Sequence, residues 1–103
     1  MKRLISFLLV LVVSTTLFGI LNAKQISIGY VLVGPHNDGG WSMRHHQGFQ
    51  SLTKHGYKVS MVEMVPESDS KKVFSKLARK HDIVFATSFG YMDPMVKAAK
   101  KNK

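Results

Sequence analysis

The residues best suited to holding a small molecule lie in two short segments, each placed directly after an apolar run. The first segment, Gly34 to Gly48, contains a carboxylate, Asp38, and the only tryptophan of the chain, Trp41. A flat aromatic face beside a hydrogen-bond acceptor suits a planar, uncharged ligand that carries N–H groups. A phosphate-binding loop would need several more glycines and a lysine. We therefore expect this segment to bind a planar heterocycle rather than a phosphate.

The second segment, Ser88 to Met92, contains Phe89, Gly90 and Tyr91. A glycine lets the backbone approach a ligand closely, and the two aromatic rings could form a pocket wall. If the two preceding strands are neighbours in one sheet, this segment faces Trp41 across the pocket.

Each candidate also has a purely structural interpretation. Trp41 could be the first core residue of a helix, and Asp38 could close an Asx-turn in its glycine-rich loop. Phe89 could be an ordinary core residue, and Gly90 an ordinary turn glycine. The residue types alone leave both interpretations open.

The elements that would position these segments follow from hydrophobic patterning. Three apolar runs rich in β-branched and aromatic residues predict buried parallel strands: Ile26–Val33, Tyr57–Val65 and Asp82–Thr87. Apolar residues at helical spacing follow each run and predict three helices. The order β-α-β-α-β-α predicts an α/β fold, a three-layer parallel sheet with right-handed crossovers.

Local signals predict where the helices begin and end. Gly56 stands where a left-handed helix C-cap is expected. The polar run Glu67–Ser70 offers capping side chains for the second helix, whose buried stripe is expected at Val73, Phe74, Leu77, Ala78 and His81. Asp93 before Pro94 is typical of an N-cap followed by the first helical residue. Three strands make a small parallel sheet, so we expect residues 24–103 to be the opening part of a larger domain.

The first 23 residues have the three-part layout of a secretory signal peptide. Met1-Lys2-Arg3 is basic, Leu4 to Leu21 is almost wholly apolar, and Ala23 offers a small residue for cleavage. An uncleaved membrane anchor is the alternative interpretation. The chain has no cysteine, so we expect neither a lipoprotein nor any disulfide in the exported form.

The chain is basic, with a formal net charge of +9, which becomes +7 once Lys2 and Arg3 are removed with the signal peptide. We expect a solvated surface with weak attraction to anionic lipid headgroups, and no nucleic-acid partner, because no basic patch is interleaved with aromatic residues. His45 and His46 are adjacent, so on a helix they point about 100° apart and do not form a metal-ligand pair. We expect no metal and no cofactor.

Four pieces of the sequence, in this order, resemble the BMP (basic membrane protein) family of PnrA-like substrate-binding proteins of bacterial ABC importers. They are Ile28–Pro35, Asp38–Trp41, Glu63–Glu67 and Phe85–Pro94. The resemblance covers Gln25 to the end of the chain. It implies the first part of lobe I of a two-lobed type I periplasmic-binding fold.

The resemblance also implies a function: binding of a purine base or purine nucleoside. The implied ligand-binding residues are Asp38, Trp41, Phe89, Gly90 and Tyr91, with the aromatic of the first loop stacking on the purine. The implied partner is an ABC permease in the cytoplasmic membrane. The protein would be a periplasmic monomer, possessing no catalytic residues.

Three alternatives stay open. The product could be a truncated remnant that binds nothing, or a sugar-binding protein of the same fold. An enzyme that processes nucleosides is disfavoured, because the sequence offers no nucleophile–base pair, no clustered carboxylates and no Gly-x-Gly-x-x-Gly motif.

Overall fold

The computed structural model describes residues 24–103, so the predicted signal peptide and its cleavage near Ala23 lie outside the described residues. The described chain forms three strands, three α-helices and one 3₁₀ helix. In chain order they are β1 (Ser27–Val31), α2 (Trp41–Thr53), β2 (Lys58–Val62), α3 (Glu67–Ala78), β3 (Ile83–Ala86), η1 (Phe89–Tyr91) and α4 (Met92–Lys101). Among residues 24–103, no helix has the length and apolar character needed to cross a membrane.

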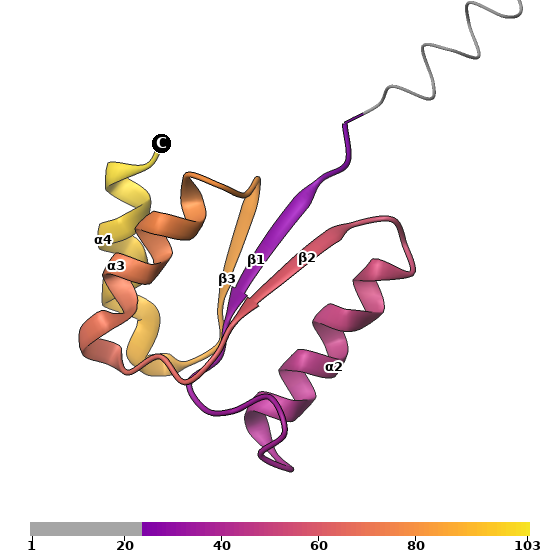
Figure 1. The fold of residues 1–103 in the computed structure, drawn as a ribbon. Helices are drawn as coiled ribbons and strands as arrows, with labels where there is room; N and C mark the ends of the chain where they lie inside the picture. The colour runs from indigo at the N-terminus through magenta and orange to yellow at the C-terminus, as the bar shows by residue number, and fades with distance from the viewer. Residues whose placement is uncertain (1–23) are drawn as a thin grey trace, which may run out of the picture.

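The three strands form one parallel sheet in the order β2-β1-β3, with β1 in the centre. Tyr30 of β1 pairs with Met61 on one side and with Phe85 on the other. Helix α2 lies on one face of the sheet, and α3 and α4 lie side by side on the opposite face (Figure 1). The predicted three-layer α/β architecture is therefore confirmed.

The main hydrophobic core lies between the sheet and the α3–α4 layer. Its buried members are Val31, Val65, Phe74, Leu77, Tyr91 and Ala98. Gly29 of β1 faces this layer, and a Cβ at that position would lie 3.1 Å from the His81 ring. The absence of a side chain there lets α3 and the segment after it approach the central strand.

The other face of the sheet is covered only in part. Tyr30 is fully buried beneath α2, where its ring stacks on Phe49 with centroids 4.3 Å apart. On β3, however, Ile83 and Phe85 stay 43% and 42% exposed. The prediction that the third strand is buried on both faces is thus wrong for the described residues. Helix α2 covers this face of β3 incompletely: the Phe49 ring lies 5.2 Å from the Phe85 ring, but both strand residues stay exposed.

The predicted helix ending at Gly56 is confirmed. Gly56 has φ +87°, and its N–H donates to the carbonyl of Thr53 while the N–H of Tyr57 donates to the carbonyl of Leu52. These two bonds and the left-handed residue form a Schellman motif, which satisfies carbonyls that the helix leaves unpaired.

The predicted side-chain caps are wrong at two helix starts, although the predicted negative charge in the first turn of the second helix is present as Glu67 and Asp69. Helix α3 begins at Glu67 with Pro66 as its N-cap, so the side chains of Ser68 and Asp69 do not cap it. Ser70 is buried and donates to the carbonyl of Glu67 instead. Helix α4 begins at Met92, because η1 runs directly into it, and this places Asp93 inside the first turn without a side-chain capping bond.

Candidate functional site

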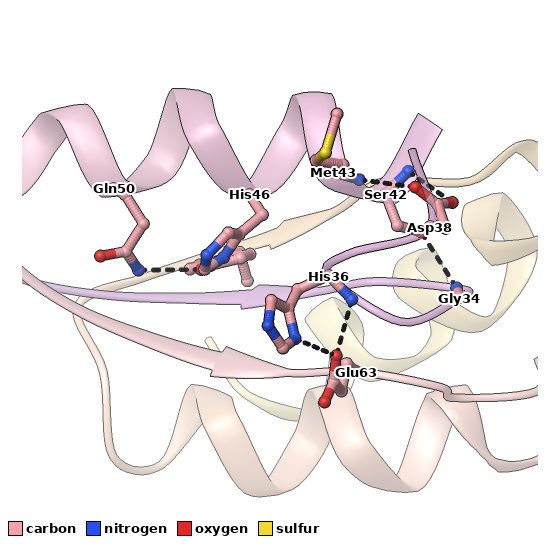
Figure 2. Close-up of polar contacts among 9 residues, drawn as sticks. Gly34, His36, Asp38, Ser42, Met43, His46, Gln50 and Glu63 are labelled. Carbon is pink, nitrogen blue, oxygen red and sulfur yellow. Dashed lines mark hydrogen bonds and ion pairs between the residues drawn. The ribbon is translucent and has the colours of Figure 1, made fainter. Parts of the chain in front are cut away.

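The loop between β1 and α2 is held by a hydrogen-bond network at the start of the helix. The carboxylate of Asp38 accepts three backbone N–H groups, from Gly40 at 2.9 Å, Ser42 at 3.1 Å and Met43 at 3.0 Å. The buried Ser42 hydroxyl in turn accepts the N–H of Gly34 at 3.1 Å. Figure 2 shows the Asp38 carboxylate directed at the first turn of α2. These bonds satisfy N–H groups that a helix start otherwise leaves unpaired.

The same bonds decide what Asp38 can do. The backbone N–H groups of Gly40 and Met43 lower the pKa of the Asp38 carboxyl below its usual range, so it is ionised near neutral pH. Both carboxylate oxygens already accept bonds within the loop. The Asx-turn interpretation of Asp38 describes this geometry, and the carboxylate orders the loop that presents Trp41.

A second anchor ties this loop to the strand beside it. The backbone N–H and the ring Nδ1 of His36 both lie 2.7 Å from Oε2 of Glu63, the residue that follows β2 (Figure 2). These bonds lower the pKa of the Glu63 carboxyl. The pair was not among the candidates from the sequence, because the two residues are far apart along the chain.

A polar group lies beneath the same loop. The Tyr30 hydroxyl is 2.7 Å from Nδ1 of His46 and accepts a hydrogen bond from Nε2 of Gln50 at 3.1 Å. The rings of His46 and His36 are 5.0 Å apart. The His36–Glu63 bonds hold the loop against the sheet, and the bonds of Tyr30 to His46 and Gln50 hold α2 against it. The loop that presents Trp41 is therefore constrained.

Trp41 lies at the rim of the sheet and is not sealed in the core. Its side chain is 52% exposed, and the indole Nε1–H donates to the backbone carbonyl of Thr87 at 2.6 Å. The indole therefore spans from the first loop to the end of β3, with one face against the ring of His45 at a centroid distance of 4.7 Å.

The second segment separates into an outward and an inward aromatic residue. Phe89 is 84% exposed, which excludes the core interpretation for the described residues. Tyr91 is fully buried, packs edge-on against Phe74, and donates its hydroxyl proton to the carbonyl of Val65. Burial, followed by the charge of Glu67, raises the Tyr91 pKa to about 12. Within the described residues, this geometry gives Tyr91 a packing role.

Gly90 has a close neighbour from the start of α3. A Cβ at this position would overlap the side chain of Glu67, which lies across the backbone of η1. The overlapping atoms belong to the exposed end of a flexible glutamate side chain, which can move aside, so this contact alone does not require glycine. The contact is separate from any approach of a ligand.

A cavity of about 330 Å³ lies where these segments meet, at the carboxyl ends of the strands. Its lining comes from the start of α2 and from the end of β3 with the residues after it: Trp41, His45, Ala86, Thr87, Ser88, Phe89 and Met92. The volume lies at the small end of the range for ligand pockets. A shallow groove of about 360 Å³ runs beside it, but it is lined by α2 residues alone and has few polar groups. The Trp41 cavity is the better candidate, since it lies where parallel α/β sheets bind ligands.

His45 is a functional candidate that sequence reasoning missed. Its Nδ1 is 2.8 Å from the backbone carbonyl of Trp41, and a carbonyl can only accept, so Nδ1 carries the proton. In the tautomer with this single N–H, Nε2 is an acceptor. The signal available in the sequence was the spacing of four residues from Trp41, which places both rings on one helix face.

The sequence candidates therefore fall into two groups. Trp41 and Phe89 line the cavity, whereas Asp38, Gly90 and Tyr91 shape the segments that surround it. Within residues 24–103, no group of three His, Cys, Asp or Glu side chains is arranged to hold a metal ion.

Comparison with known proteins finds relatives in sequence and in structure, and no family model matches the chain. The chain is 39% identical over 83 residues to a purine-binding protein of Brucella abortus, covering 76% of this chain and 24% of that protein. It is 32% identical over 80 residues to a Haloferax volcanii protein named as an ABC transporter glucose-binding protein, covering 75% of this chain and 20% of the relative.

One solved structure similar to this chain is that of an ABC transporter system solute-binding protein from Conexibacter woesei. It superposes with a TM-score of 0.70 at 18% sequence identity, over 75% of this chain and 26% of that chain. At this identity the likeness shows the fold. The chain spans between a fifth and a quarter of the length of the curated relatives it matches.

Proposed function

We propose that this chain is part of a substrate-binding protein of an ABC transporter, of the BMP or PnrA-like type, and that it contributes one wall of a purine-binding site. The relatives named as a purine-binding protein and an ABC transporter glucose-binding protein support this proposal. The ligand is a purine base or nucleoside, bound at the cavity between the start of α2 and the end of β3. The protein that contains this wall delivers the ligand to an ABC permease. It is a binding protein and not an enzyme.

The observation that carries this proposal is the placement of Trp41. Its half-exposed indole is fixed by the bond to Thr87 and faces a cavity shared with the exposed ring of Phe89. Stacking on such a ring contributes about 1–3 kcal/mol per base. His45 Nε2 supplies an acceptor for a purine N–H group at the same cavity. The purine-binding relative supports the same ligand class.

The domain organisation and the cellular location belong to the same proposal. Residues 1–23 act as a cleaved signal peptide, and residues 24–103 form the N-terminal part of lobe I. The product is periplasmic, without a lipid anchor, and monomeric. Closure over the ligand would come from a second lobe by a hinge motion.

A sugar is the second candidate ligand, because one relative is named for glucose binding. A tryptophan face also packs against sugar rings, so stacking by Trp41 alone does not separate the two classes. His45 does not separate them either, since Nε2 can accept a hydrogen bond from the ring N–H of a base or from a sugar hydroxyl. The purine is placed first because the purine-binding relative is 39% identical to this chain and the glucose-binding one 32%.

The test is a titration of the complete protein that contains this chain, followed by tryptophan fluorescence. Adenine and adenosine are compared with ribose and glucose. We expect the purines to quench the Trp41 emission and the sugars to leave it unchanged, with a Trp41→Phe variant as the control that assigns the signal. Quenching by glucose alone would transfer the assignment to a sugar, and chemical conversion of adenosine during incubation would indicate an enzyme.

A further inference from the structure

The charged residues of the described chain are sorted between the two ends of the sheet. Of the six carboxylates, five lie at or after the carboxyl ends of the strands, in the loops or in the first turns of α3 and α4. They are Asp38, Glu63, Glu67, Asp69 and Asp93. Asp82, which precedes β3, is the one carboxylate at the opposite end. We call this opposite end, where the strands begin, the basal end.

The basal end is strongly cationic. Helices α3 and α4 both end there. The start of β1 and the turn between α2 and β2 lie at the same end (Figure 1). The basic residues on these segments are Lys24, Lys54, Lys58, Lys76, Arg79, Lys80, Lys97, Lys100, Lys101 and Lys103, and each of them is exposed.

The two helix ends that carry most of this charge lie against each other. Asn102, which follows α4, donates a hydrogen bond through Nδ2 to the hydroxyl of Ser75 in α3 at 3.4 Å. The cations on the last turns of α3 and α4 therefore form one continuous surface. Basic side chains near a helix C-terminus complement the helix dipole, and this explains two or three of them but not ten.

Almost none of this charge is neutralised within the described part of the chain. One ion pair there involves a lysine, between Nζ of Lys24 and Asp82 at 3.1 Å. Asp82 also accepts the backbone N–H and the hydroxyl of Ser27, so it is held at the start of β1. The lysines and arginine of α3 and α4 extend into solvent without a counter-charge.

We propose that the basal end is a docking surface for an anionic phospholipid membrane. The cations come from several segments, and the cavity of about 200 Å³ between α3, α4 and the start of β3 is lined by none of them. Their attraction therefore suits a surface of many headgroups. The basal end also exposes Ile26, Tyr57 and Ile83, side chains that suit the boundary between headgroups and acyl chains. A nucleic acid would be expected to meet several stacking rings, and Tyr57 is the one aromatic residue exposed there among the described residues.

Docking through the basal end would fix the orientation of the domain on the membrane. The Trp41 cavity lies at the carboxyl ends of the strands, so the lipid-bound protein holds this cavity away from the membrane surface, and delivery to a permease would require release from the lipid. Lipid binding and ligand binding therefore use opposite ends of the domain, and neither should block the other.

The test is co-sedimentation of the purified protein with vesicles of phosphatidylglycerol and phosphatidylcholine, compared with vesicles of phosphatidylcholine alone. The basal variant replaces Lys97, Lys100 and Lys101 by Gln. The matched control replaces Arg44, Lys71 and Lys72 by Gln, so that both variants lose three positive charges. We expect binding to the anionic vesicles that weakens with added salt, and the basal variant to bind about 100-fold more weakly. The control should stay within about threefold of the unmodified protein.

Several outcomes would overturn the proposal. Equal binding to neutral vesicles would remove the electrostatic basis, and equal losses in both variants would show that net charge, not the basal end, matters. Tighter binding of a DNA duplex than of the vesicles, lost in the same basal variant, would assign the surface to nucleic acid. Unchanged far-UV circular dichroism of both variants confirms that a loss of binding is not a loss of folding.

Discussion

The indole N–H of Trp41 donates to the backbone carbonyl of Thr87 across 2.6 Å. The two residues lie 46 positions apart, one at the first turn of α2 and the other just after β3. This bond fixes the plane of an exposed aromatic ring, so the ring is held in place before any ligand arrives. Because less side-chain freedom is then lost on binding, the contact can contribute more of its stacking energy to affinity.

Replacing Trp41 by Ala and by Phe separates stacking from positioning. Trp41→Ala removes the stacking surface and should weaken purine binding by about 1–3 kcal/mol, or roughly 5–150-fold. Trp41→Phe keeps a ring but loses the bond to Thr87, so its affinity should lie between that of the unmodified protein and that of Trp41→Ala. Calorimetric titration of the complete protein measures both. Equal affinities for Trp41→Ala and the unmodified protein would place the purine elsewhere.

His45 should contribute as a hydrogen-bond acceptor. His45→Gln offers a terminal amide oxygen in a comparable position, whereas His45→Phe offers none. We expect His45→Phe to weaken purine binding by about 0.5–1.5 kcal/mol, roughly 2–13-fold, and His45→Gln to recover part of this loss. His55→Phe, in the turn after α2, is the control and should leave the affinity unchanged. A loss that His45→Gln does not recover would indicate packing against Trp41 instead.

The strands and their order were predictable because apolar runs of this length have few alternatives to a buried sheet. The exposure of one face of β3 could not be predicted, since burial of Phe85 depends on how far α2 extends across the sheet. The start of α4 was missed for a local reason. The sequence Asp93-Pro94 is a good cap signal, but the preceding 3₁₀ turn already supplies helical backbone at Met92.

The site was predictable in part. Trp41 and Phe89 were found from residue type and from their position after a strand. Phe89 and Tyr91 could not be told apart, because both are aromatic residues of one short turn. In a 3₁₀ helix, residues two apart lie about 120° apart around the axis, so one faces inward when the other faces out. The role of Asp38 depends on the N–H groups of α2, which only the folded loop brings within reach.

Tyr91→Phe tests whether this residue serves the core or the ligand. The change removes the hydroxyl that donates to the buried carbonyl of Val65, and an unsatisfied buried acceptor costs about 1–3 kcal/mol. We expect the free energy of unfolding to fall by that amount in urea titrations, with purine affinity unchanged. Tyr57→Phe, at an exposed ring, should change neither quantity. A loss of affinity at full stability would return Tyr91 to the site.

Stability should decrease in acid because three carboxylates accept hydrogen bonds that favour their ionised form. The pKa values of Asp38, Glu63 and Asp82 are each lowered, first of all by backbone N–H donors. A lowered folded-state pKa gives stability that is present above the unfolded-state pKa, near pH 4, and is lost as the pH falls through the folded value. The urea midpoint should therefore drop below about pH 5 and stay nearly constant above it as far as these groups are concerned.

A single variant can assign part of this acid response. Asp38→Asn removes the titrating group while keeping an oxygen that can accept the N–H groups of Gly40 and Met43. We expect its urea midpoint to be lower than that of the unmodified protein at pH 7 and its dependence on pH to be shallower. Asp93→Asn, at a carboxylate that makes no capping bond, should keep the full pH dependence. Identical slopes for all three proteins would exclude Asp38 as a contributor.

Met64 is the one non-glycine residue of the described chain with a left-handed backbone, at φ +57°, and it lies two residues after the end of β2. A side chain in this region costs about 1–2 kcal/mol, and a β-branched one costs more. Its side chain is 65% exposed, so little packing is lost on its removal. We expect Met64→Gly to raise the free energy of unfolding by up to about 1 kcal/mol, since the greater freedom of glycine in the unfolded chain offsets part of the relief. Met64→Val should lower the free energy of unfolding by about 1–2 kcal/mol.

Met92 serves as the control. It is equally exposed but has helical backbone at φ −57°, so Met92→Gly should lower the stability where Met64→Gly raises it. The same sign of change at both positions would mean that the Met64 backbone is not strained.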